Sequence, residues 1–281
     1  MRPSERDEML ATNVHQREYY ENATGSDESC VNSGATNLWR RMRARVFSVL
    51  ASDAAKERLR HLHLGWLGPL SNLRILDLGV GDGNLLSFDL ARGAGEYVAV
   101  DLSSARLARF NQKLTASGIP GARLLSADFL DPKSDLGRFD VIYAMAVLHH
   151  FRHVQALVDA LENRLVPGGR IISYDPLQTW LPMRLVRAAY RPLQTDRAWE
   201  FPFSRHTLAV LTRQFHLLNI QGFYGRSKWA LPLAMVSHTG AEEAARRWHD
   251  YDLKQARSVD AVGHCLHVSL HLRRRGPEDG A

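Results

Sequence analysis

The stretch Leu73-Arg-Ile-Leu-Asp77-Leu-Gly79-Val-Gly81-Asp-Gly83-Asn84-Leu-Leu86 decides the fold. It reads as an apolar strand that runs into an acidic residue, then into three glycines on alternate positions, and then into a helical pattern. Glycines at this spacing let the backbone turn sharply and approach a ligand closely, while the N-terminus of the following helix faces the same point. The pattern therefore predicts a nucleotide-type ligand at the edge of a doubly wound parallel sheet.

Three residues narrow the chemistry of this ligand. Asn84 stands where a NAD-binding turn needs Gly or Ala. Asp77 comes just before the first glycine, where a carboxylate disfavours a pyrophosphate and favours a cationic ligand. A second strand ends in Asp101, about 20 residues downstream, which suits the hydroxyls of a ribose. S-adenosylmethionine (SAM) is a cationic ligand that carries both a ribose and an adenine.

Four ordered motifs resemble those of the class I SAM-dependent methyltransferases of the small-molecule type, which share a core with the ubiquinone and menaquinone methyltransferases. The resemblance covers about residues 70 to 175. The motifs are Asp77-Leu-Gly79-Val-Gly81-Asp-Gly83, Ser126-Ala-Asp128-Phe129, Phe139-Asp140-Val-Ile-Tyr-Ala144-Met145-Ala-Val-Leu148-His149-His150-Phe151 and Leu165-Val-Pro167-Gly168-Gly169-Arg-Ile-Ile.

Strand and helix patterns alternate from Leu73 to about Asp175, which is typical of a parallel sheet with right-handed crossovers. With the resemblance, we expect an α/β, Rossmann-like fold: a seven-stranded, mostly parallel sheet with helices on both faces and an antiparallel last strand. The expected strands lie near 73–78, 96–101, 122–126, 139–144, 169–174, 216–224 and 265–272.

The expected domain organisation places additions around this core. They are an N-terminal helical lid or flexible segment over 1–69, a methyltransferase core over 70–275, a cap insertion after the fifth strand at 176–204, a helical insert at 226–262 and a disordered tail at 276–281.

The resemblance also implies a set of cofactor contacts. The methionine end of SAM would face Asp77 and the glycine loop, the ribose would bind Asp101, and the adenine would lie beside Asp128. The alternative for these acids is a strand-end or helix-capping role. The full expected set is Asp77, Gly79, Gly81, Asp101, Leu102, Asp128, Phe129, Ala144 and Met145.

Candidate catalytic residues follow the fourth and fifth strands. His150, and after it His149, should lie near the sulfonium, where a neutral imidazole could take a proton from the methyl acceptor. The alternative is that both histidines are walls of the site. Asp175, at the end of the fifth strand, is either an acceptor contact or the start of an Asp-Pro turn.

Aromatic residues outside the core pattern are candidates for contact with the acceptor. A cap over an apolar acceptor and a packed satellite cluster are the two interpretations. The residues are Tyr19, Tyr20, Trp180, Tyr190, Trp199 and Phe203.

Composition bounds the partners and the compartment. The formal net charge is +6, but its basic runs at 40–45 and 273–275 are short and suit solvated faces, which argues against a nucleic-acid partner. No apolar run approaches the roughly 18 residues of a membrane span. The first residues are too charged for a secretory signal, which favours the cytoplasm. Cys30 and Cys265 form no metal-binding pattern, so we expect no metal.

These features predict an enzyme that transfers a methyl group from SAM to an oxygen or nitrogen of a small, partly apolar metabolite, such as one of secondary metabolism. The product would be S-adenosylhomocysteine (SAH). The alternatives are methylation of carbon, methylation of RNA or protein, and a SAM-binding module without catalysis. An RNA or protein methyltransferase would carry Asn/Asp-Pro-Pro-Tyr/Phe after the fourth strand, where this chain has Ala144-Met-Ala-Val-Leu-His149. The acceptor, the methylated atom and the oligomeric state stay open.

Overall fold

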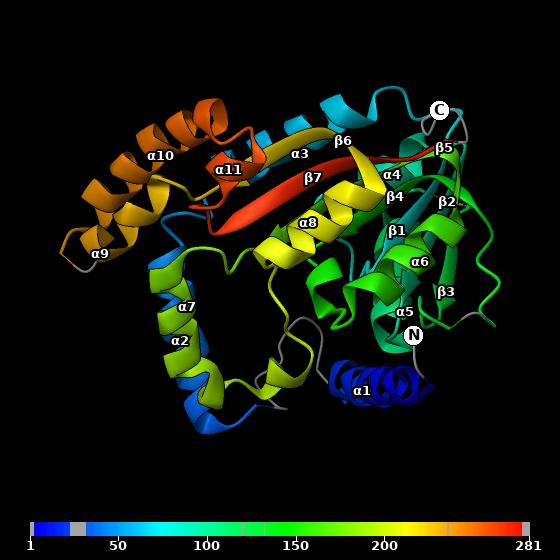
Figure 1. The fold of residues 1–281 in the computed structure, drawn as a ribbon, viewed down its shortest axis with the longest axis horizontal. Helices are drawn as coiled ribbons and strands as arrows, with labels where there is room; N and C mark the ends of the chain where they lie inside the picture. Colours follow the sequence, from blue (N-terminus) through cyan, green and yellow to red (C-terminus); the bar gives the residue numbers. More distant parts are fainter. Residues whose placement is uncertain (1–2, 23–31, 120, 132, 235, 277–281) are drawn as a thin grey trace.

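A seven-stranded sheet forms the centre of the molecule (Figure 1). The computed structural model describes residues 3–22, 32–119, 121–131, 133–234 and 236–276. The strand order is β3-β2-β1-β4-β5-β7-β6. The strands are β1 (Arg74–Leu78), β2 (Glu96–Asp101), β3 (Arg123–Ser126), β4 (Phe139–Met145), β5 (Leu165–Pro176), β6 (Phe215–Phe223) and β7 (His267–Arg274).

The pairing confirms the expected sheet. The first five strands pair in parallel, and β7 lies between β5 and β6, antiparallel to both. β1 and β4 are neighbours at the centre, and the strand order reverses between them. In such sheets, ligands bind beyond the carboxyl ends of the strands at this reversal. The topology thus brings the loop after β1 and the loop after β4 to one place.

Helices cover both faces of the sheet, as expected. The α3 (Asp53–Leu67), α4 (Ser87–Gly93) and α5 (Ser104–Ala116) helices contribute buried apolar side chains to one face, including Leu67, Leu90 and Phe110. The α6 (Val154–Arg164) and α8 (Arg205–Gln214) helices cover the other, through Leu161 and Leu211 among others. The central strands are buried on both sides, which explains their continuous apolar runs.

The N-terminal helices lie in two different places. Helix α1 (Pro3–Asn22) lies beside α5, near the carboxyl ends of the parallel strands (Figure 1). Helix α3 instead packs on the sheet, where the ring of buried His63 lies 3.2 Å from Tyr143 Oη and 2.8 Å from Ser269 Oγ. Within the expected lid or flexible segment over 1–69, α3 therefore belongs to the core, and a lid stays a prediction for α1 and α2 (Gly34–Phe47) alone. Residues 23–31 lie outside the described part of the chain.

One insertion follows β5 and a second follows β6. The first carries α7 (Leu181–Tyr190) and the short turns η2 (Arg191–Leu193) and η3 (Thr195–Ala198), and a bridge between Leu177 and Phe203 closes it. It lies beside α2 in Figure 1. The second carries η4 (Ser227–Trp229), α9 (Ala230–Ala234), α10 (His238–Gln255) and α11 (Val259–Val262).

Strand β7 is the last regular element of the described chain. The described residues end at Gly276, so most of the tail expected to be disordered lies outside them. Among the helices that the structure describes, none is long and apolar enough to cross a membrane.

Candidate functional site

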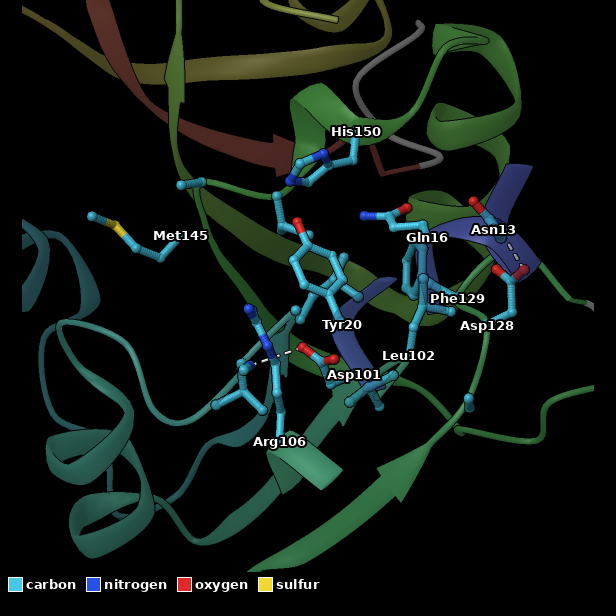
Figure 2. Close-up of a pocket in the computed structure, with 18 of the residues that line it drawn as sticks. Asn13, Gln16, Tyr20, Asp101, Leu102, Arg106, Asp128, Phe129, Met145 and His150 are labelled. Carbon is cyan, nitrogen blue, oxygen red and sulfur yellow. Dashed lines mark hydrogen bonds between the residues drawn. The ribbon is translucent and has the colours of Figure 1, made fainter. Parts of the chain in front are cut away.

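A cavity of about 410 Å³ opens at the carboxyl ends of β1, β2 and β4 (Figure 2). The loops after these strands form its floor, and one face of α1 forms the opposite wall. Its lining residues are Asn13, Gln16, Tyr20, Leu78, Gly79, Val80, Gly81, Asp82, Gly83, Val100, Asp101, Leu102, Arg106, Ala127, Asp128, Phe129, Met145, Ala146, Val147, His150 and Phe151. Seven of the nine expected cofactor residues line this cavity; Asp77 and Ala144 do not.

The glycine loop forms one end of the cavity. Gly79 and Gly81 have φ values of +65° and +56°, a conformation that glycine adopts at little cost. A Cβ atom on Gly79 would collide with the side chain of Val147, from the loop after β4. The two loops therefore approach each other too closely for any other residue at this position.

Asp101 joins the glycine loop to the end of β2. Its two carboxylate oxygens accept hydrogen bonds from the backbone N–H groups of Gly81 (2.8 Å) and Ser103 (2.9 Å). Burial raises the pKa of Asp101, and these two N–H donors oppose that shift. The carboxylate is thus fixed in orientation at the floor of the cavity (Figure 2).

Asp77 lies under the loop, where it is fully buried. It accepts hydrogen bonds of 2.7 Å from Asn84 Nδ2, Ser87 Oγ and Tyr97 Oη. Burial raises the pKa of Asp77 to about 6, against the effect of these donors. Asp77 therefore shapes the glycine loop from below and does not itself face the cavity. Asn84 and Tyr97 are partners that the sequence motifs did not identify.

The loop after β4 carries strain at the cavity. Ala144 is fully buried in the strand, while Met145, Ala146 and Val147 reach the lining. Ala146 has a φ of +58°, and its N–H donates to Tyr174 O at 2.7 Å. A non-glycine residue in this region stores strain of about 1–3 kcal/mol, and such residues cluster at functional sites.

Helix α1 closes the side of the cavity opposite the sheet. Asn13 Nδ2 donates to Asp128 at 2.7 Å, and the Arg106 guanidinium lies 4.0 Å from the ring centroid of Tyr20. Figure 2 shows Asn13, Gln16 and Tyr20 directed toward the strand ends. The sequence motifs do not identify Asn13, Gln16 or Arg106, because these residues belong to no motif. Helical spacing at positions 13, 16 and 20 is a signal for the residues of α1, but not for Arg106, which lies on α5.

His150 lines the cavity, between the loop after β4 and the cap insertion. Its Nδ1 lies 2.8 Å from Trp199 O. A carbonyl oxygen can only accept, so Nδ1 carries the proton in the neutral ring and Nε2 is the basic nitrogen.

His149 has a different environment from its neighbour. It is buried, its Nδ1 lies 2.9 Å from Asp175 Oδ1, and its Nε2 lies 3.6 Å from Glu200 Oε2. Burial opposes protonation, but the two carboxylates outweigh it and raise the pKa of His149 to about 9. The pKa of Glu200 falls to about 2, because the contacts with His149 outweigh its burial. His149 is therefore an imidazolium at neutral pH and cannot act as a base there.

The same residues are the strongest candidates for holding an ion. His149, His150 and Glu200 bring three possible ligand atoms within 4.8 Å of one another. A protonated His149, with Nδ1 hydrogen bonded to Asp175 and Nε2 3.6 Å from Glu200, offers no lone pair to a metal. His149 would have to lose this proton before an ion could bind to it.

Comparisons with known proteins agree with this geometry. Residues 75–169 match the family model described as a methyltransferase domain. The chain is 37% identical over 105 residues to a ubiquinone biosynthesis O-methyltransferase of Xylella fastidiosa, covering 37% of this chain and 42% of the relative. It is 32% identical over 124 residues to ribosomal RNA small subunit methyltransferase C of Chromohalobacter salexigens, covering 41% and 36%. The chain carries the core of a class I SAM-dependent methyltransferase.

Solved structures extend the likeness of this methyltransferase core to the whole fold. Geranyl diphosphate C-methyltransferase from Streptomyces coelicolor aligns with a TM-score of 0.58 and 15% identity, over 94% of this chain and 98% of that one. Magnesium protoporphyrin IX methyltransferase from Synechocystis aligns with a TM-score of 0.55 and 17% identity, over 94% and 99%. At this identity the match concerns the fold. The curated relatives above are matched over less than half of their length.

The aromatic residues expected around the acceptor do not form one cluster. Tyr20 lines the methyltransferase cavity. Tyr19 and Trp199 are both buried, and their ring centroids lie 5.4 Å apart. Trp180 packs edge-on against Trp229 at 5.6 Å and does not line this cavity. Two further positions differ again: Tyr190 lines a second cavity, between α2 and α7, and Phe203 lies in the central core at 1% exposure.

Proposed function

We propose that this chain transfers the methyl group of SAM to an oxygen or nitrogen of a small, partly apolar metabolite and releases SAH. The observation that carries the proposal is that the glycine loop, Asp101 and His150 line one cavity. A cofactor end and a basic nitrogen thus share a single enclosed space at the strand reversal.

The residues present fit SAM. The fixed carboxylate of Asp101 matches the ribose diol, Asp128 and Phe129 would flank the adenine, and the loops carrying Gly79 and Met145 would enclose the methionine end. When bound, SAM supplies an already activated methyl group. The protein must then align the acceptor, exclude water and take a proton where the acceptor carries one.

His150 is the residue that supports the proton transfer. Its Nδ1 is tied to Trp199 O, so Nε2 is the nitrogen that would take the proton of an acceptor hydroxyl or amine. His149 would hold Asp175 and Glu200 in place behind it, as a positioning residue.

Helix α1 favours a small acceptor over RNA. Its side chains Asn13 and Tyr20 contact Asp128 and Arg106 directly across the cavity. A nucleotide within a folded RNA would have to displace this helix before it reached the cofactor site. RNA methylation, suggested by the ribosomal RNA relative, is thus the second candidate.

The test combines binding with turnover. Calorimetry on the full chain should show SAM and SAH binding at one site. Transfer of tritium from methyl-labelled SAM should then be screened against pools of phenols, amines and carboxylic acids, with total RNA as a separate arm. We expect label in the small-molecule arm, and a parallel arm with a chelator tests whether His149, His150 and Glu200 need an ion. Label in RNA alone, or absence of SAM binding, would overturn the proposal.

A further inference from the structure

A second cavity, of about 150 Å³, lies between α2, α7 and the start of β7. Its walls are largely apolar, but two arginines enter it, and none of its lining residues is acidic. The lining consists of Met42, Arg43, Phe47, Met183, Val186, Arg187, Tyr190, Leu266 and His267. We propose that this cavity binds a carboxylate group on the methyl acceptor, an inference that rests on the function proposed above.

Arg187 is the first observation that points to an anion. Its Nε is buried without a hydrogen-bond partner, and the residue forms no salt bridge within the described structure. Burial lowers the pKa of Arg187, and the nearby charge of Arg43 lowers it further. A half-buried guanidinium with an unused donor is costly unless an acceptor meets it.

Arg43 adds a second cation, which forms no salt bridge with a described carboxylate, although its charge acts on Glu200. Its guanidinium lies 5.7 Å from the ring centroid of Phe47, on the solvent side of the cavity. Two guanidinium groups on opposing helices can grip one carboxylate from two directions, because each presents several N–H donors in a plane.

The charges around the cavity leave at least one positive charge unbalanced. Among the described residues, the charges that act on Arg187 are those of Arg43 and Arg191, both positive, and that of the Glu200 carboxylate. Glu200 is already in contact with His149, whose Nε2 lies 3.6 Å from Glu200 Oε2. An anionic group on the acceptor would offset the remaining positive charge, and a carboxylate presents two oxygens in one plane to a planar guanidinium group.

Packed side chains lie between this cavity and the cofactor cavity. His267 packs against Tyr174 with ring centroids 5.0 Å apart, and Tyr174 belongs to the cluster that also includes Met145 of the first cavity. His267 adds no charge, because burial lowers its pKa to about 3, and its buried Nδ1 has no hydrogen-bond partner. An acceptor held by its carboxylate here would have its apolar body between α2 and α7, and its nucleophile would reach His150 only past these side chains.

Benzoate, benzamide and phenyl phosphate test this proposal on the full chain loaded with SAH. Ligand-observed NMR should give a dissociation constant for benzoate at least about 10-fold lower than for the other two. Arg187→Gln and Arg43→Gln should each weaken benzoate binding by about 10-fold or more and leave benzamide unchanged. Arg184→Gln, on the exposed face of α7, is the matched control.

Any one of four results would overturn the proposed carboxylate site. Such results are no benzoate binding at millimolar concentration, equal binding of benzamide, tighter binding of phenyl phosphate, or an equal loss in Arg184→Gln. SAM binding is measured separately on every variant and should stay unchanged. A chain that binds benzoate through Arg187 but not SAM would fail the proposed function and keep this site.

Discussion

The cavity at the strand ends and the cavity between α2 and α7 are built in opposite ways. The first is formed mainly by backbone turned at a sheet edge, with Gly79, Gly81 and Ala146 in left-handed conformations. The second is formed by side chains on two helices that are about 140 residues apart in the sequence. A backbone site needs particular residues at fixed spacing, whereas a side-chain site can change without altering the fold. Sequence motifs therefore identify the cavity at the strand ends, whereas they do not identify the cavity between α2 and α7.

The neighbouring residues His149 and His150 offer the sharpest test, because we expect the first to affect stability and the second to affect the rate of methyl transfer. His149→Gln should destabilise the fold by about 3–5 kcal/mol, since it leaves Asp175 and Glu200 buried without their cation. Urea unfolding at pH 6.5 measures this loss.

The pH dependence of that stability has a defined sign. The pKa of His149 is raised from 6.5 to about 9 in the folded state, so its contribution is complete below pH 6.5 and disappears as the pH rises through 9. The wild type should lose about 3 kcal/mol across this window relative to His149→Gln. Parallel pH profiles for the two proteins would show that His149 is neutral.

His150→Ala should act on turnover and spare the fold. Loss of a general base costs about 100-fold or more in rate, and the acidic limb of the pH–rate profile should vanish with it. His150→Gln, which can retain a hydrogen bond to Trp199 O, should lose as much activity. A modest loss with an unchanged profile would make His150 a wall residue and leave methyl transfer without a base.

Asp101→Ala should weaken SAM binding by about 5- to 150-fold, because it removes the expected ribose partner. It also frees the N–H groups of Gly81 and Ser103, so thermal unfolding without ligand is needed to separate the two effects. Asp101→Asn keeps one acceptor oxygen and should fall in between. Calorimetry that finds wild-type affinity in a folded Asp101→Ala protein would remove Asp101 from the cofactor site.

The sheet and the cofactor loop could be predicted from the sequence, since periodicity and glycine spacing report on local backbone. Asp77 was assigned to the ligand, but its carboxylate is buried beneath the loop and bound by Asn84 and Tyr97. Phe203 was expected near the acceptor and lies in the core. An aromatic residue is visible in a sequence, whereas the direction of its side chain depends on tertiary packing. Glu200 and Arg187 could be identified only from the structure, in which the cap insertion places Glu200 beside His149 and Arg187 near Arg43.

Asn13→Ala should have the smallest effect, and it tests whether α1 contributes to the cofactor cavity or acts only as a lid. Its amide donates to Asp128 at 2.7 Å, beside the expected adenine position. Loss of one such bond costs about 0.5–1.5 kcal/mol, or roughly 2- to 10-fold in SAM affinity. Val14→Ala, at a position 52% exposed on the same helix, is the matched control. If Asn13→Ala leaves SAM affinity unchanged but raises the Michaelis constant for the acceptor, α1 contacts the acceptor and not the cofactor.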